Sequence, residues 1–111
     1  SVRFRAAESN AKVLVKHLSS HSKVTKVRYP GFGAVVSFEV KDGPEKADRV
    51  CESSRIITHA TSLGGIESLW ERRRRWPAES TLTPENLIRF SVGCENVEDL
   101  WRDIEQSFTN S

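Results

Sequence analysis

The chain has 111 residues, with 17 Lys and Arg against 15 Asp and Glu, and a formal net charge of +2. A chain of this length can bury a core, and its near-neutral balance argues against a protein that binds polyanions through overall charge. The 2 cysteines are too few for a disulfide scaffold, and no apolar stretch is long enough to span a bilayer. We therefore expect one cytoplasmic domain over residues 1–111. Because methionine is absent, we also expect it to derive from a longer chain.

The first third of the chain predicts a helix and a strand hairpin. An apolar stripe at helical spacing, which ends near residues 19–22, comprises Ala11, Leu14, Val15 and Leu18. Residues 24–29 are rich in strand formers and precede the turn signal Pro30–Gly31. A second strand over residues 33–40 places alternate apolar side chains on one face, namely Ala34, Val36, Phe38 and Val40. The short connection between the two strands predicts an antiparallel pair.

The rest of the chain predicts two further helices and two further strands. Asp42 or Gly43 caps a helix that has Pro44 near its first position, and its inner face comprises Ala47, Val50, Cys51 and Ser54. Residues 55–58 form a short extended piece. Residues 87–92 form a strand that points Ile88, Phe90 and Val92 to one side and Arg89 and Ser91 to the other. Asn96 and Asp99 form an approximate capping box before a last helix, whose inner face comprises Val97, Leu100, Trp101, Ile104 and Phe108.

The predicted helices are apolar on one side only, and the predicted strands are half-buried. Two packed layers, one of helices and one of strands, best bury their apolar sides. The predicted fold class is therefore α+β, a two-layer sandwich of a mostly antiparallel sheet with helices on one face. Such folds host many unrelated functions, so function has to be argued from motifs.

Four motifs occur in a characteristic order: YPG at 29–31, FGAVVSFEV at 32–40, ATSLGGIESL at 60–69 and LIRFSVGCENVEDLWRDI at 87–104. Together they resemble the carboxy-terminal domain of the Cys/Met-metabolism enzymes that depend on pyridoxal phosphate (PLP). This family includes cystathionine gamma-synthase, the cystathionine lyases and methionine gamma-lyase. The resemblance covers nearly the whole chain and implies the small domain of a fold-type I PLP enzyme, without the large PLP-binding domain.

The resemblance implies a binding site for the substrate α-carboxylate at Arg89 and Ser62. A guanidinium can meet a carboxylate with two parallel charge-assisted hydrogen bonds, which fixes the plane of the carboxylate. Thr61, Leu63 and Gly64 would belong to a loop on the substrate side. Without the resemblance, Arg89 would be interpreted as a solvated strand residue and Ser62 as a loop residue.

The implied activity is C–S bond cleavage or γ-replacement on amino acids such as cystathionine or O-acylhomoserine, with PLP bound in the full-length enzyme. No lysine stands in a setting like that of the family's cofactor lysine; the lysines are Lys12, Lys16, Lys23, Lys26, Lys41 and Lys46. We therefore expect no catalytic, cofactor-binding or metal-binding residue in this chain, and no activity from it alone. The resemblance also implies a homo-oligomer and an amino-acid substrate shared with the large domain.

Two stretches depart from the family's pattern. Most members carry an additional segment with a helix after the position of Gly31, and many carry a His-Pro segment where this chain has WERRRRWP at 70–77. These departures indicate a divergent subgroup, so the particular reaction stays open.

The Arg72–Arg75 run supports an alternative function, a stand-alone module that binds nucleic acid or protein. Guanidiniums beside Trp70 and Trp76 could hold phosphates and stack on bases. Because nearby glutamates offset the charge, a solvated loop or a surface for docking to the missing domain or a neighbouring subunit is the favoured interpretation; these are Glu67, Glu71 and Glu79. No catalytic role is assigned to the histidines, which are His17, His21 and His59.

Overall fold

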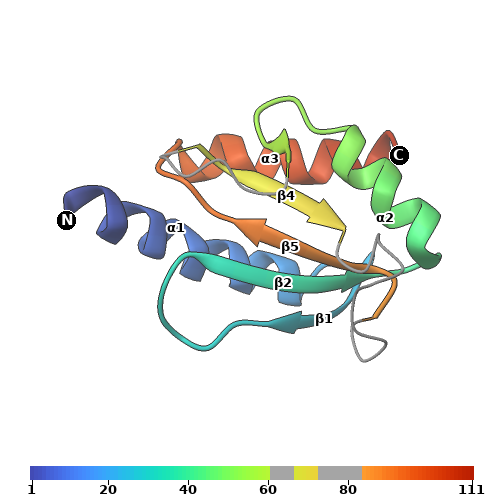
Figure 1. The fold of residues 1–111 in the computed structure, drawn as a ribbon, viewed down its shortest axis with the longest axis horizontal. Helices are drawn as coiled ribbons and strands as arrows, with labels where there is room; N and C mark the ends of the chain where they lie inside the picture. The colour runs from blue at the N-terminus through green and yellow to red at the C-terminus, as the bar shows by residue number, and fades with distance from the viewer. Residues whose placement is uncertain (61–66, 73–83) are drawn as a thin grey trace.

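The fold is that of a computed structural model, which describes residues 1–60, 67–72 and 84–111. Along the chain the helices and strands are α1 (Val2–Ser19), β1 (Val24–Arg28), β2 (Val35–Val40), α2 (Gly43–Glu52), β3 (Thr58–His59), β4 (Leu69–Arg72), β5 (Leu87–Ser91) and α3 (Val97–Thr109). Figure 1 shows how they are arranged.

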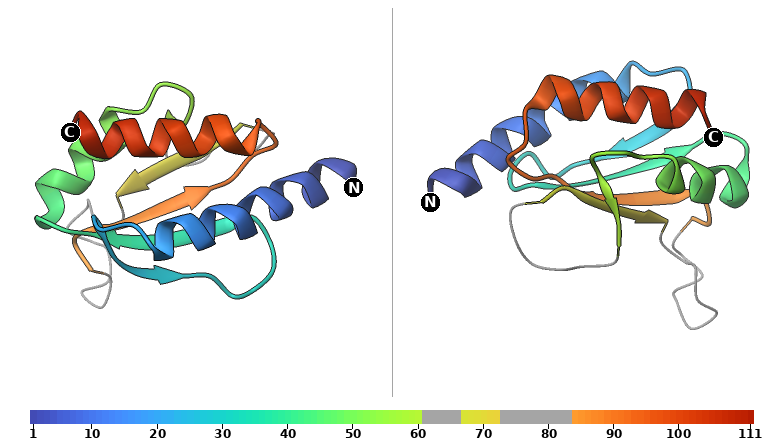
Figure 2. Two further views of the ribbon diagram at one scale, coloured as in Figure 1. Left: turned by 180° about the vertical axis from the view of Figure 1, so that it is seen from behind. Right: turned by 90° about the horizontal axis from the view of Figure 1, so that it is seen from above.

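Within the described residues the strands form one sheet in the order β1-β2-β5-β4-β3. The pairs β1–β2, β2–β5 and β4–β5 are antiparallel, and β3–β4 is parallel. All the described helices lie on one face of this sheet, as the two views of Figure 2 show. The predicted two-layer α+β sandwich and the predicted antiparallel pairing of the first two strands are both confirmed.

The core lies between the sheet and the helices, and the periodicities predicted from the sequence mark its two sides. The sheet contributes buried side chains that alternate along β2 and β5, namely Val36, Phe38, Val40, Ile88 and Phe90. The helices contribute buried stripes, namely Ala11, Leu14 and Leu18 of α1, Ala47, Val50 and Cys51 of α2, and Leu100, Ile104 and Phe108 of α3. Val35, the first residue of β2 and next to the fully buried Val36, is 42% exposed, as expected for a strand with one covered face.

β4 is a strand that the sequence did not predict. Leu69, Trp70 and Glu71 are all buried, so the period-2 alternation that identifies a half-covered strand is missing from this stretch. Trp70 is fully buried and packs between Phe38 and Phe90, with ring centroids 6.4 and 5.6 Å away. Its indole N–H donates to the Cys51 carbonyl and to Ser54 Oγ, both at 3.1 Å.

The extended piece predicted at residues 55–58 is also displaced, because β3 comprises only Thr58 and His59. The backbone N–H groups of residues 55–57 instead donate to the Asp103 carboxylate of α3, at distances of 2.8, 2.8 and 2.9 Å. Burial raises the pKa of Asp103, but the hydrogen bonds from these N–H groups and from the Gln106 side chain together lower it by more. The pKa of Asp103 therefore lies below its ordinary value. A carboxylate distant in sequence therefore holds this segment out of the sheet.

The observed helix caps agree in part with those predicted from the sequence. Asn96 accepts from the N–H groups of Glu98 and Asp99, as the N-cap of a capping box does. The Asp99 carboxylate lies 3.2 Å from Arg102 Nη2, in an ion pair within α3. Asp42 is the N-cap residue of α2 with a left-handed φ of 72°, and its side chain makes no capping hydrogen bond.

Replacing Trp70 with alanine is expected to lower the free energy of unfolding by about 3–5 kcal/mol, because it removes the largest side chain that is fully buried among the described residues and leaves a cavity. Urea denaturation measures the change. Trp101→Ala is the matched control; its half-buried ring stacks on His17, and it should cost about 1–2 kcal/mol. Equal losses in the two variants would contradict the central position of Trp70.

Asp103→Asn is expected to cost about 2 kcal/mol at neutral pH, because an amide cannot accept all the N–H groups that the carboxylate accepts. The folded-state pKa is lowered, so this stabilisation is complete above about pH 4, the ordinary aspartate value, and is lost as the pH falls through the folded-state pKa. Urea denaturation at several pH values should show the two proteins converging in acid. Asp99→Asn, at an exposed position, should show no comparable difference at any pH.

Candidate functional site

Arg89 lies on the sheet face opposite to the helices. Its neighbours Ile88 and Phe90 are fully buried in the core, so the alternation of β5 turns Arg89 to the other face. In the strand register Arg89 lies directly across from Ser37 of β2 on one side and Glu71 of β4 on the other. The predicted orientation of this arginine is therefore confirmed.

The guanidinium of Arg89 makes no hydrogen bond or ion pair with any of the described residues, although Arg89 is half-buried. Among the described residues two carboxylates share its face, Glu71 directly across on β4 and Glu39 at a diagonal position on β2. Glu39 pairs with Arg28, with Oε2 2.6 Å from Nη1, and Glu71 has an interaction of its own. A half-buried cation that the neighbouring carboxylates leave unpaired is suited to bind an external carboxylate.

The other predicted site residues lie outside the described part of the chain. These are Ser62 and the loop residues Thr61, Leu63 and Gly64. The pairing of Ser62 with Arg89 therefore stays a prediction.

A polar network that the sequence did not predict joins the segment after this loop to the turn that follows β5. Ser68 is fully buried, and its N–H and hydroxyl donate to the two carboxylate oxygens of Glu95 at 2.9 and 2.7 Å. Ser68 Oγ in turn accepts from the Gly93 N–H at 2.8 Å. Asn10 of α1 donates to the carbonyls of Gly93 and Glu95 at 3.0 and 2.8 Å. The network joins the start of β4, the turn after β5 and α1, and only the assembled fold brings these together.

Part of the Arg72–Arg75 patch is built into the fold. Arg72 ends β4, and its Nε lies 2.8 Å from Asp48 Oδ1 of α2, with 14% of its side chain exposed. The interpretation as a solvated loop is therefore wrong for Arg72, while Arg73–Arg75 lie outside the described residues. Since Trp70 is fully buried, it cannot stack on a nucleic-acid base.

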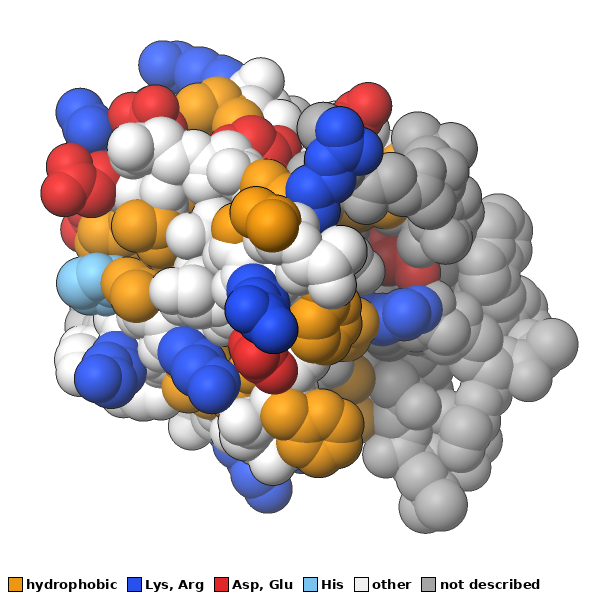
Figure 3. Space-filling model, turned by 90° about the vertical axis from the view of Figure 1, so that its left-hand side faces the viewer, with side chains coloured by type: hydrophobic (Ala, Val, Ile, Leu, Met, Phe, Trp, Pro, Cys, Tyr) orange, Lys and Arg blue, Asp and Glu red, His pale blue; other side chains and the backbone are white. Residues whose placement is uncertain are grey.

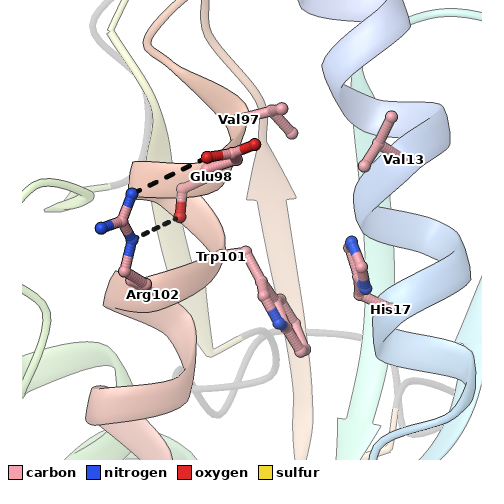
Figure 4. Close-up of a pocket in the computed structure, with 6 residues that line it drawn as sticks. All are labelled: Val13, His17, Val97, Glu98, Trp101 and Arg102. Atoms are coloured by element: carbon pink, nitrogen blue, oxygen red, sulfur yellow. Dashed lines mark hydrogen bonds and ion pairs between the residues drawn. The ribbon is translucent and has the colours of Figure 1, made fainter.

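His17 and His21, at the end of α1, pack against aromatic side chains of α3. A groove of about 540 Å³ lies between α1 and α3, lined by Val13, His17, Val97, Glu98, Trp101 and Arg102. Figure 4 shows these side chains on the two helices. The His17 ring stacks on Trp101 with centroids 4.9 Å apart, and His21, just after α1, stacks on Phe108 at 4.7 Å. These rings lie in the helical layer, on the opposite side of the sheet from Arg89.

A second surface feature lies at the end of the molecule where α1 begins, where Figure 3 shows exposed hydrophobic side chains. Phe4 is 53% exposed there, at a pocket of about 270 Å³ lined by Arg3, Phe4, Ala7, Ala34, Val92, Gly93 and Cys94. The lining is mostly apolar, which is more typical of a protein contact than of a site for a carboxylate.

Both cysteines are free; Cys51 is buried, and Cys94 is half-buried. Burial, followed by the nearby carboxylates of Asp48, Glu71 and Glu52, raises the pKa of the Cys51 thiol far above its ordinary value, so this thiol is no nucleophile.

Among the described residues no group of His, Cys, Asp and Glu side chains has the arrangement of a metal site. Nor does any helix in the described ranges have the length and apolar character needed to cross a bilayer. The cytoplasmic location stays a prediction.

The comparison with known proteins gives a consistent result. The family model described as Cys/Met metabolism PLP-dependent enzyme matches residues 1–109. The L-methionine gamma-lyase of Fusobacterium nucleatum subsp. nucleatum is 34% identical over 133 residues, which cover 95% of this chain and 33% of that protein. The cystathionine gamma-synthase of Mycobacterium tuberculosis H37Rv is 32% identical over 127 residues, covering 96% and 33%. Both alignments are longer than this chain of 111 residues, so these relatives carry residues that it lacks within the matched region.

Solved structures agree with this assignment. The crystal structure of metB from Corynebacterium glutamicum matches with a TM-score of 0.90 and 35% identity, over 98% of this chain and 34% of that one. The cystathionine gamma-lyase of Lactobacillus plantarum, solved in complex with L-serine, matches with a TM-score of 0.85 and 33% identity, over 97% and 34%. The chain thus spans about a third of the length of these relatives. It belongs to the family of Cys/Met metabolism PLP-dependent enzymes.

Proposed function

We propose that this chain is the small carboxy-terminal domain of a PLP-dependent enzyme and that Arg89 binds the α-carboxylate of its amino-acid substrate. The observation that carries the proposal is the half-buried Arg89 guanidinium, unpaired among the described residues, on the sheet face opposite to the helices. The proposed reactions of the full-length protein are C–S bond cleavage or γ-replacement on amino acids such as cystathionine or O-acylhomoserine.

The proposed carboxylate contact depends on where β5 lies. β5 is hydrogen-bonded to β2 on one edge and to β4 on the other, so the backbone of Arg89 is held from both sides. A side chain that starts from a rigid strand loses less entropy when it binds than one on a loop. Partial burial strengthens the pairing, because fewer water molecules screen the two charges. A bidentate contact would fix both the position and the plane of the carboxylate.

We propose that the described residues do not hold PLP by themselves. The strand neighbours of Arg89 are Ser37 and Glu71, and Lys46, a half-buried lysine of α2, donates to the Ser111 carbonyl at 2.7 Å. The cofactor would therefore be held by the part of the enzyme outside this chain, where it would stabilise negative charge at the substrate's α and β carbons. Arg89 would orient the substrate for that chemistry, and Ser62 remains its proposed partner at the carboxylate.

In the full-length protein, Arg89→Ala is expected to lower kcat/KM about 100- to 1000-fold, because two charge-assisted hydrogen bonds to the carboxylate are lost. Steady-state kinetics with L-methionine, L-cystathionine and O-acetyl-L-homoserine would identify the best substrate and measure the loss. Arg89→Lys should recover part of the activity, since it keeps the charge but not the planar fork.

The control is Arg102→Ala, which removes the same charge from an exposed position on α3. Calorimetric binding of L-serine and of ethanolamine, its counterpart without a carboxylate, adds a specific readout. Arg89→Ala should weaken the binding of L-serine and leave that of ethanolamine unchanged. If Arg89→Ala loses no more activity than Arg102→Ala, Arg89 is not the carboxylate residue.

A further inference from the structure

Arg89 has a potential competitor for its charge within its own sheet. Glu39 lies across from Leu87, two residues along β5 from Arg89, and on the same face of the sheet as Arg89. Diagonal neighbours in an antiparallel pair have Cα atoms about 7–8 Å apart, which long side chains can span. Glu39 could therefore reach Arg89 if nothing else held it.

Arg28 holds Glu39 on the other side. In the register Arg28 of β1 lies across from Ser37, so Glu39 stands between Arg28 on the edge strand and Arg89 on the central strand. Oε2 of Glu39 lies 2.6 Å from Nη1 of Arg28, with 18% of the Glu39 side chain exposed. Nη1 is buried and has no acceptor in hydrogen-bond geometry, so the contact is a pairing of charges rather than an aligned hydrogen bond.

The same strand supplies a second cation, which makes no such contact. Lys26 lies directly across from Glu39 in the register, yet it is exposed and forms no ion pair with Glu39. Lys26 and Arg28 thus share a strand, a charge and a face, and only Arg28 engages the carboxylate. On the far side of Arg89, Glu71 has an interaction of its own.

We propose that Arg28 is a positioning residue for the carboxylate site, because its ion pair with Glu39 keeps that carboxylate away from Arg89. This inference rests on the proposed function of Arg89. A carboxylate tethered in the same sheet acts at a high effective concentration, so a released Glu39 would compete with the substrate. The apparent affinity for the substrate falls with the fraction of Arg89 that remains unpaired.

The test uses the full-length protein and the best substrate found for it. Arg28→Ala and the longer Arg28→Gln are each expected to raise KM about three- to tenfold while kcat stays within about twofold, because only the fraction of unpaired Arg89 changes. Removing the competitor as well, in Arg28→Ala/Glu39→Gln, should return KM to within about twofold of the Glu39→Gln value. Lys26→Ala removes the same charge from the same strand and should leave KM unchanged.

Three outcomes would overturn the inference. The first is a double variant that binds as poorly as Arg28→Ala, since Arg28 would then act through packing or its own charge. The second is an equal rise in KM in Lys26→Ala, which would indicate a general effect of positive potential. The third is an unchanged KM in Arg28→Ala and Arg28→Gln. If Arg89→Ala still shows its large loss, the third outcome removes the role of Arg28 and leaves the proposed function standing.

Discussion

The pairing of β5 with β2 on one edge and β4 on the other is the constraint on which the rest of the site depends. It sends Ile88 and Phe90 into the core and thereby forces Arg89 to the opposite face. The same alternation supplies stability and the candidate site, because a one-residue slip of β5 would bury a guanidinium and expose Phe90. The Glu95–Ser68–Gly93 network strengthens the β4–β5 pairing at one end of these strands.

This register sets the positions of the charged side chains on the sheet face opposite to the helices. Arg28, Ser37, Arg89 and Glu71 lie in one row across the neighbouring strands β1, β2, β5 and β4, and Glu39 lies two residues from Ser37 along β2. Glu39 forms an ion pair with Arg28 of the edge strand β1. A binding site needs a cation that the protein itself has not neutralised, even though leaving one half-buried is costly. The Arg28–Glu39 pair is consistent with that requirement.

The sequence predicted those parts of the fold whose signal is local. Alternation in β2 and β5 and the stripes of the helices gave the correct faces, including that of Arg89, because each pattern fits within a few residues of chain. β4 was missed since Leu69, Trp70 and Glu71 are all buried. The error at residues 55–57 arose from Asp103, which lies 46–48 residues away in sequence. The Arg28–Glu39 pair could not be predicted either, because an irregularity between Val24 and Lys26 shifts the register of β1.

A carboxylate site on a rigid strand also bears on specificity. In the proposed function Arg89 recognises the one group that all α-amino acids share, so it contributes affinity and orientation without distinguishing their side chains. Relatives named L-methionine gamma-lyase and cystathionine gamma-synthase match this chain at 34% and 32% identity, so overall similarity does not separate these two classes. The choice among such substrates must then depend on residues other than Arg89, which contact the part of the substrate beyond its α-carbon.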